Sequence, residues 1–294
     1  MHSYLRAVGF SDVHSITQLN RLIGEIARHY DDKIIFESED GRYMAEISRE
    51  YGEGFGLTVC GEYDENNMFY AEYVFPYFKG QNESSAEDVV IEKHVANDSY
   101  TGACDDLRVG TTIIFYLENM GEYLAGRNRY TGVAHGCSTV MSGLCLAGKI
   151  LLPMEKQDEA AAAERNDSDR SRLDLMQAAR DGDEEAMESL SIEDFDTYSM
   201  LIERVSNEDV LSIVDTYFMP NGADCECYSV LGTILDVEST RNDVTGEELW
   251  RLTIECNDIP LEIGIHKNDL VGEPEIGRRF KGNIWLQGHV YFND

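Results

Sequence analysis

The chain has 294 residues, 43% of them hydrophobic, so it can bury a core and is too apolar for wholesale disorder. Its 56 acidic and 24 basic residues give a formal net charge of −32. Such a surface repels nucleic acids and anionic membranes, because affinity for both depends on Lys and Arg. We therefore expect neither as a partner, and we keep a basic protein partner, steered by the electric field, as an alternative to simple solubility.

The compartment is predicted from the first residues and from the cysteines. Residues 1–10 contain neither a basic segment nor an apolar one, so no signal peptide is predicted. No apolar run approaches the roughly 20 residues that a membrane-spanning helix needs. Seven cysteines, an odd number, favour reduced thiols over disulfides. The sequence therefore predicts a cytoplasmic protein.

The first half of the chain predicts one helix followed by antiparallel strands. Ser15 and Gln18 form the pattern of a capping box. Apolar residues then recur at helical spacing, at Ile16, Leu19, Leu22, Ile23, Ile26 and Tyr30. After Asp32, short extended runs alternate with polar and glycine turns. Residues 1–154 are therefore predicted to form an α+β domain, an antiparallel sheet with one main helix.

A change of composition marks the middle of the chain. Residues 155–190 are charged and rich in alanine, without a hydrophobic stripe, and predict a partly helical acidic linker. Two helices are predicted after it, opening at Ser191 and Ser206, each with an Asp three positions later that favours the helix N-terminus. The second helix is predicted to include Phe218 and to stop at Pro220.

The end of the chain predicts a small barrel. Residues 225–294 contain several runs in which apolar and polar residues alternate, the period of a strand. Gly282 and Gly288 in the last run permit sharp bending. These runs predict an OB-like β-barrel or curled sheet. Together with the helical pair, the barrel is expected to form a second domain over residues 191–294.

The last strand carries the candidate binding face. One of its sides holds four polar or aromatic side chains: Trp285, Gln287, His289 and Tyr291. Trp and Tyr combine apolar area with a polar tip, which suits partner recognition. The two preceding helices, however, need a surface on which to bury their aromatic residues, so we favour a covered face. The exposure of Trp285 decides between a binding site and scaffold.

Other constellations are weaker, and no strong catalytic motif is present. His135 and Cys137 lie two residues apart and could pair a base with a thiol nucleophile. No arginine follows to bind phosphate, and free cysteines are most often buried. Cys225 and Cys227 have one residue between them, closer than the usual zinc pair. We predict no metal and no cofactor.

Five segments carry a resemblance to a known family: "MHSYLRAVGF", "GTTIIFYLENMGEYLAG", "GKILLPM", "SIVDTYFMPNG" and "GEPEIGRRFKGNIWLQGH". They resemble uncharacterised proteins of clostridial and related gut Firmicutes that are grouped as a domain of unknown function. The resemblance implies a bacterial cytoplasmic protein. It implies no activity, ligand or catalytic residue.

The sequence favours a non-enzymatic cytoplasmic binding or regulatory protein that acts through protein–protein contacts. Helix caps and cores are well formed, whereas no catalytic constellation stands out. The alternative is a hydrolase-like enzyme whose site is assembled from distant residues around His135 and Cys137. A third hypothesis is a metal-dependent site near Cys225 and Cys227.

Overall fold

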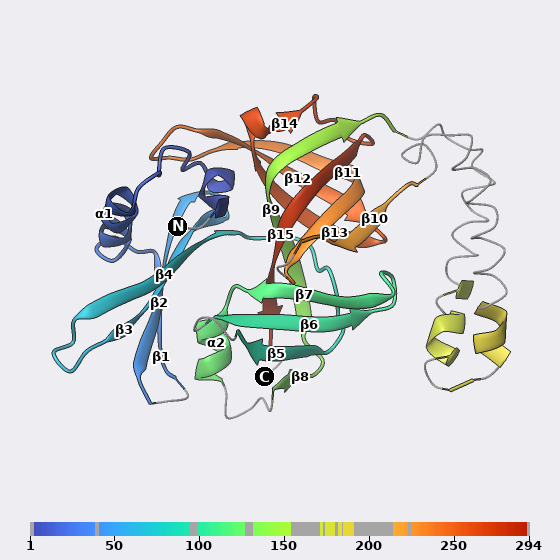
Figure 1. The fold of residues 1–294 in the computed structure, drawn as a ribbon, viewed down its shortest axis with the longest axis horizontal. Helices are drawn as coiled ribbons and strands as arrows, with labels where there is room; N and C mark the ends of the chain where they lie inside the picture. Colours follow the sequence, from blue (N-terminus) through green and yellow to red (C-terminus); the bar gives the residue numbers. More distant parts are fainter. Residues whose placement is uncertain are drawn as a thin grey trace.

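The computed structural model describes residues 3–38, 41–94, 99–126, 132–153, 171–172, 174–179, 182–183, 185–190, 214–222 and 225–292. Within these ranges the chain is mostly β-structure. It forms a 4-stranded antiparallel sheet and an 11-stranded sheet that contains a closed barrel (Figure 1). No helix in the described ranges is both long enough and apolar enough to cross a membrane.

The N-terminal part begins with the 3-10 helix η1 (Ser3–Val8) and the helix α1 (Ile16–Ile26). The predicted capping box is present at the start of α1. The Ser15 side chain accepts a hydrogen bond from Gln18 N, and Ser15 N donates to Gln18 Oε1 at 3.0 Å. Both bonds satisfy amide groups that have no partner inside the helix. The apolar side of α1 lies against the first sheet.

The first sheet confirms the antiparallel strands that the sequence predicted. Its strands follow chain order: β1 (Asp32–Glu37), β2 (Tyr43–Gly52), β3 (Phe55–Tyr63) and β4 (Phe69–Phe78). Gly54 turns the chain between β2 and β3 at a φ of 71°, a conformation that glycine adopts without strain. The sheet leaves β4 at one edge, where it meets the second sheet.

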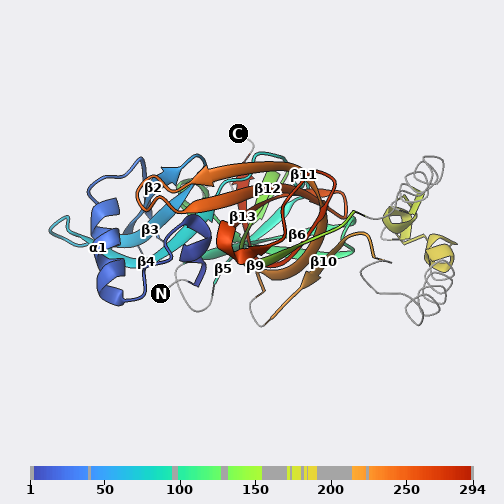
Figure 2. The same ribbon diagram turned by 90° about the horizontal axis from the view of Figure 1, so that it is seen from above.

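The second sheet begins before residue 154 and ends near the C-terminus. Its earlier elements are β5 (Val89–Lys93), β6 (Tyr100–Asp106), β7 (Thr111–Leu117), α2 (Met120–Ala125), β8 (Val133–Ala134) and β9 (Ser138–Leu151). Its later elements are β10 (Tyr217–Pro220), β11 (Cys227–Arg241), β12 (Glu248–Cys256), β13 (Ile259–His266), η2 (Lys267–Asp269), β14 (Leu270–Val271) and β15 (Arg279–Tyr291). Figure 2 shows the hairpin of β11 and β12 reaching toward the first sheet, where Asp243 N donates to Tyr51 O at 2.7 Å.

The predicted small barrel is present, but the last part of the chain does not form it alone. The strands β11, β12, β13, β9 and β15 pair in that order, and β15 pairs with β11 to close the ring. Gly282 of β15 pairs with Gly148 of β9. A Cβ on Gly148 would lie 2.6 Å from the Phe280 ring. The sheet thus joins strands from both sides of the predicted linker, and the division into domains at residues 154 and 191 stays a prediction.

The prediction that a helix extends to Phe218 is wrong. Residues Tyr217–Pro220 form β10, in which Phe218 pairs with Val230 of β11. Phe218 is buried, and its ring centroid lies 4.5 Å from that of Tyr228. Apolar residues three or four apart suit a helix, but in a short run this spacing does not exclude a strand. The helices predicted over residues 191–213 lie outside the described residues. In the predicted linker, residues 174–179 and 185–190 are helical.

Two buried side chains join the outer edge of β4 to the second sheet. Gln287 of β15 donates to Pro76 O at 2.7 Å and accepts from Phe78 N at 3.3 Å. These are the two backbone groups that a further strand would pair. Arg251 of β12 donates to Lys79 O at 3.0 Å, and its guanidinium lies 4.3 Å from the centre of the Phe78 ring. The two sheets are therefore connected by hydrogen bonds as well as by apolar packing.

We predict that Gln287→Leu lowers the free energy of unfolding by about 2–4 kcal/mol, because it leaves a buried amide and a buried carbonyl without partners. Gln81→Leu is the matched control, since Gln81 is exposed, and a surface change of this kind is expected to stay within about 0.5 kcal/mol. Urea denaturation of both variants measures the difference. Equal effects of the two substitutions would contradict the role of Gln287.

Candidate functional site

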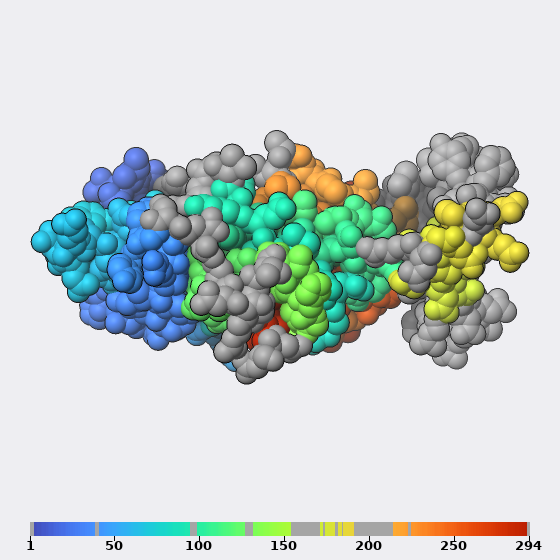
Figure 3. Space-filling model, turned by 90° about the horizontal axis from the view of Figure 1, so that it is seen from below, coloured from blue at the N-terminus to red at the C-terminus, as the bar shows by residue number. Residues whose placement is uncertain are grey.

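A pocket of about 180 Å³ lies where the first sheet meets the ends of β7 and β15. We call it the intersheet pocket. Its wall comes from both sheets and from α2: Asp31, Asp32, Ile34, Glu46, Ser48, Glu50, Thr58, Tyr77, Lys79, Glu118, Asn119, Glu122 and His289. Figure 3 shows a face of the molecule on which the first sheet, in blue, lies beside green residues from the middle of the chain.

The pairing of β7 with β15 brings Glu118 and His289 together. The two strands run parallel, with Gly288 opposite Leu117, and Glu118 N donates to Gly288 O at 2.9 Å. Glu118 and His289 are the next residues on the two strands, so they lie side by side. Glycine is needed at 288, because a Cβ there would lie 2.4 Å from the Phe115 ring. An acid and an imidazole thus reach the pocket from adjacent strand ends.

Glu46 contributes a buried carboxyl group from the middle of β2. Its exposed fraction is 5%. Gly121 N, in the first turn of α2, donates to Glu46 Oε2 at 2.7 Å, and the Cys60 thiol lies 3.9 Å from Oε1. Burial raises the pKa of Glu46 to about 8, and the hydrogen bond from Gly121 offsets only part of this effect. Glu46 therefore retains its proton at neutral pH.

Glu118 and His289 are also neutral near pH 7, for the same reason. Burial raises the pKa of Glu118 to about 8, although the Ser142 hydroxyl donates to it at 3.3 Å and Lys79 lies nearby. Burial lowers the pKa of His289, while the charge of Glu122 acts in the opposite direction. A neutral acid beside a neutral imidazole is a pattern that marks functional sites, because ionisable groups are seldom withdrawn from water without a partner.

Lys79, Glu50 and Glu122 of the pocket already have side-chain partners. Lys79 Nζ donates to Glu50 Oε1 at 2.8 Å. Asn119 donates to Glu122 Oε2 at 2.9 Å and forms two further hydrogen bonds with the backbone of Val290. Among the described residues, none forms a hydrogen bond with the His289 ring. The pocket therefore presents acceptors without an available cation.

The four residues of the predicted binding face have different surroundings. Trp285 is 7% exposed, and its ring packs against Tyr4 of η1 and Tyr116 of β7, with centroids 5.6 Å and 5.0 Å away. Gln287 is fully buried, whereas Tyr291 is 52% exposed. By the criterion of burial, Trp285 belongs to the scaffold. His289 is the member of the set that lines the pocket.

Sequence reasoning missed Glu46 and Glu118. Each is a glutamate within or directly after a run of strand residues, and that pattern is the signal that could have indicated them. An acidic residue in such a run is rarely buried unless it is paired or functional. The sequence could not show that the two runs approach each other, because β2 and β7 belong to different sheets.

His135 and Cys137 do not form a pair of base and nucleophile. The His135 ring is exposed, and its Nδ1 lies 2.6 Å from Asp88 Oδ2. The Cys137 thiol is buried and donates to Ala134 O at 3.3 Å. Burial raises the pKa of Cys137, which disfavours the reactive thiolate. This geometry gives the hydrolase-like alternative no support.

The cysteines near residue 225 are spread over different environments. Cys225 is exposed, Cys227 is partly buried, and the buried Cys256 thiol donates to Tyr217 O at 2.9 Å. In the described part of the chain, no three His, Cys, Asp or Glu side chains are arranged to hold a metal ion. The hypothesis of a metal-dependent site at Cys225 and Cys227 is therefore not supported by a cluster of ligands.

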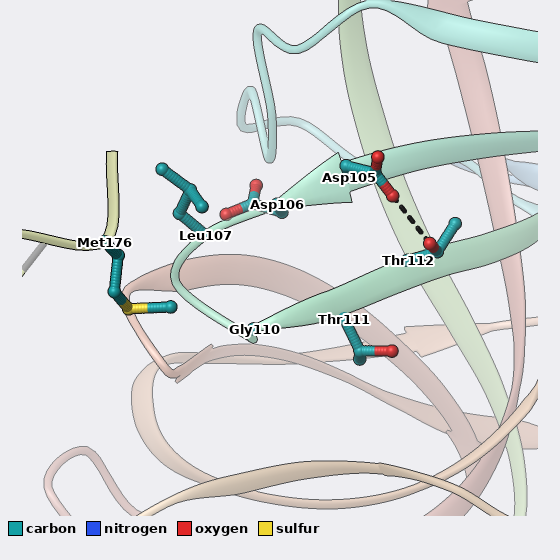
Figure 4. A pocket seen from close by; sticks show the side chains of 7 residues that line it. All are labelled: Asp105, Asp106, Leu107, Gly110, Thr111, Thr112 and Met176. Atoms are coloured by element: carbon teal, nitrogen blue, oxygen red, sulfur yellow. Dashed lines mark hydrogen bonds between the residues drawn. The ribbon is translucent and has the colours of Figure 1, made fainter. Parts of the chain in front are cut away.

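A second pocket, of about 320 Å³, lies at the turn between β6 and β7 (Figure 4). Its two carboxylates accept hydrogen bonds from neighbouring side chains. Asp105 accepts from Thr112 at 2.6 Å, and Asp106 accepts from Arg108 at 2.6 Å and from Ser85 at 3.1 Å. Because these carboxylates are paired, the second pocket is a weaker candidate than the intersheet pocket.

Comparison with protein-family models gives one match, over residues 5–288. The family is described as "Domain of unknown function, E. rectale Gene description (DUF3881)". A search of curated proteins found no match, and a search of solved structures found none either. Similarity therefore supplies a family but no activity.

We predict that Glu46→Gln reduces the pH dependence of stability. A folded-state pKa of about 8 against 4.5 means that the folded chain holds the proton more tightly, so this stabilisation is present below pH 4.5 and is lost as pH rises through 8. Between pH 6 and pH 8 the loss amounts to about 2 kcal/mol for Glu46. Urea denaturation at both pH values measures it, with the exposed Glu92→Gln as control. Parallel pH profiles of wild type and Glu46→Gln would refute the prediction.

Proposed function

The chain belongs to the DUF3881 family of unknown function, which confirms the resemblance seen in its sequence, and we propose its role from its own residues. We propose a non-enzymatic cytoplasmic binding or regulatory protein that acts through contacts with a basic protein partner. A basic side chain of that partner enters the intersheet pocket. The observation that carries the proposal is the composition of the wall, with six carboxyl side chains and one lysine that already pairs with Glu50.

The charge of the whole chain supports the same class of partner. A net charge of −32 attracts a basic protein from a distance and increases its association rate, an effect that salt weakens. The same charge opposes binding of nucleic acids. All seven cysteines have free thiols, which supports a reducing compartment such as the cytoplasm.

Binding has more support than catalysis by the two candidates that the sequence offered. His135 pairs with Asp88, and the Cys137 thiol is buried and protonated. The intersheet pocket, in contrast, lies between two sheets, a place where ligand sites commonly form. Its few converging polar groups would fix the orientation of a side chain that enters.

We further propose that the barrel is of the OB type, with its last strand placed first in the chain. An OB barrel pairs its five strands in the order 1-2-3-5-4 and closes strand 4 on strand 1, with strands 3 and 5 parallel. The ring of β11, β12, β13, β9 and β15 has this order, and β13 pairs with β9 in parallel. In this proposal β9 is the fifth strand, and the helical pair predicted over residues 191–213 lies in the connection from β9 to β11.

We predict that an oligolysine peptide binds the full chain and that its fully acetylated counterpart does not. Glu122→Lys, which reverses a charge at the pocket, is expected to weaken binding about tenfold, or about 1.4 kcal/mol. Glu92→Lys makes the same change of net charge on β5, outside the pocket, and is expected to weaken binding about twofold or less. Fluorescence anisotropy at physiological salt measures the binding of both peptides to the wild type and of oligolysine to the two variants.

Equal losses in the Glu122→Lys and Glu92→Lys variants would show that the peptide responds only to net charge, and would contradict the pocket as the recognition site. Equal binding of the acetylated peptide would contradict a basic partner.

A further inference from the structure

If the intersheet pocket receives a basic side chain, as the proposed function holds, its lining also indicates which chemical group it accepts. Glu118 and His289 lie side by side on parallel strands and both line the pocket. The Ser142 hydroxyl occupies Glu118 Oε1, and no described residue forms a hydrogen bond with Oε2. The neutral His289 ring also has an acceptor nitrogen for a ligand. The pocket thus contains two neighbouring polar groups, Glu118 Oε2 and the His289 ring, that make no hydrogen bond to the described residues.

Burial keeps Glu118 neutral when the pocket is empty, and the Ser142 hydroxyl and the charge of Lys79 offset only part of this effect. Glu46 and Glu50 of β2, Glu122 of α2 and the aspartates that begin β1 supply negative charge or further acid groups. Tyr77 and His289 are uncharged, because burial raises the pKa of the first and lowers that of the second. Lys79 is the one lysine or arginine among the described lining residues, and it pairs with Glu50. Ionised Glu118 would have no cation of its own.

The free groups fit an ammonium better than a guanidinium. A guanidinium is planar and is recognised best by both oxygens of one carboxylate. Oε2 is the oxygen of Glu118 that makes no hydrogen bond to the described residues, since Oε1 accepts from Ser142 at 3.3 Å. An ammonium is a compact charge with three donors that can point to separate acceptors. Glu118 Oε2 and a ring nitrogen of His289 offer such acceptors from two strands.

We infer that the intersheet pocket binds one primary ammonium group, such as that of a lysine side chain, in exchange for the proton of Glu118. The ligand keeps all its bonds. The O–H bond of Glu118 breaks, its proton passes to the solvent buffer, and the carboxylate that remains pairs with the ammonium. Glu46 takes no part in the exchange, because burial keeps it protonated and its two oxygens already accept hydrogen bonds from Gly121 N and the Cys60 thiol.

The exchange makes binding depend on pH. With a pKa of about 8, Glu118 is protonated in the empty pocket at neutral pH, and the bound ammonium favours its ionised form. Affinity is therefore expected to rise by up to about tenfold per pH unit from pH 6 towards pH 8, and to level off above pH 8. A lysine ligand remains charged throughout this range.

Isothermal titration calorimetry of the full chain at pH 7 tests the exchange. The probes are the oligolysine peptide, an oligoarginine peptide of the same length and n-butylammonium. Each titration is made in phosphate and in MOPS, two buffers without a primary amine whose ionisation enthalpies differ, so that the difference in heat counts the released protons. Wild type and Glu46→Gln are expected to release about one proton per ammonium bound, and Glu118→Gln none.

Oligolysine binding to wild type without proton release would overturn the inference and leave the proposed function standing. Equal affinity and equal proton release with oligoarginine would overturn the preference for ammonium. Binding of n-butylammonium with proton release, but not of oligolysine, would uphold the exchange and overturn the protein partner. Binding of neither probe would overturn both proposals. The wild-type titrations decide these outcomes even if Glu118→Gln fails to fold.

Discussion

The edge of β4 is held by side chains where another strand would normally lie, and the candidate site depends on this arrangement. Gln287 supplies both the donor and the acceptor that Pro76 and Phe78 need. An unpaired strand edge in the interior would leave backbone groups without partners, at a high cost in free energy. Because Gln287 is two residues from His289, the same segment of β15 that satisfies β4 also brings His289 to the pocket.

The contact between the two sheets reduces the exposure of two carboxyl groups to water. Once the first sheet lies against α2 and the end of β7, Glu46 is buried and Glu118 is partly buried, with no free cation beside either among the described residues. Burying an ionised carboxylate alone is far more costly than burying its neutral form, so each holds a proton near pH 7. A chain with a net charge of −32 thus keeps two of its acids uncharged. Proteins often retain such destabilising groups where binding requires them.

Local signals in the sequence predicted local structure well. The capping box at Ser15 and the alternating strands were visible, because helix caps and strand periodicity depend on neighbouring residues. Long-range pairing was not visible. Nothing in residues 138–151 indicates that β9 completes a barrel with strands that follow more than 70 residues later along the chain. The same limit explains why β10 was predicted as part of a helix. Its apolar spacing suits a helix, and only its pairing with β11 shows that it is a strand.

The candidate site shows the same division. Periodicity placed His289 with Trp285 on one side of a strand, but it could not tell that Tyr4 and Tyr116 cover Trp285. Glu46 and Glu118 could not be selected among 56 acidic residues, because burial of a carboxyl group is a property of the folded chain. The sequence allowed local patterns to be predicted, whereas it did not allow the contact between the two sheets to be predicted.

Glu46 and Glu118, two of the four glutamates that line the pocket, are neutral at neutral pH, and the proposed exchange depends on this. A pH titration of side-chain carboxyl carbons by ¹³C NMR measures this directly, with Glu46→Gln and Glu118→Gln used to assign the signals. The account predicts two glutamates that titrate near pH 8, where burial places the pKa of both groups. Titration of both residues near the ordinary pKa of 4.5 would contradict it.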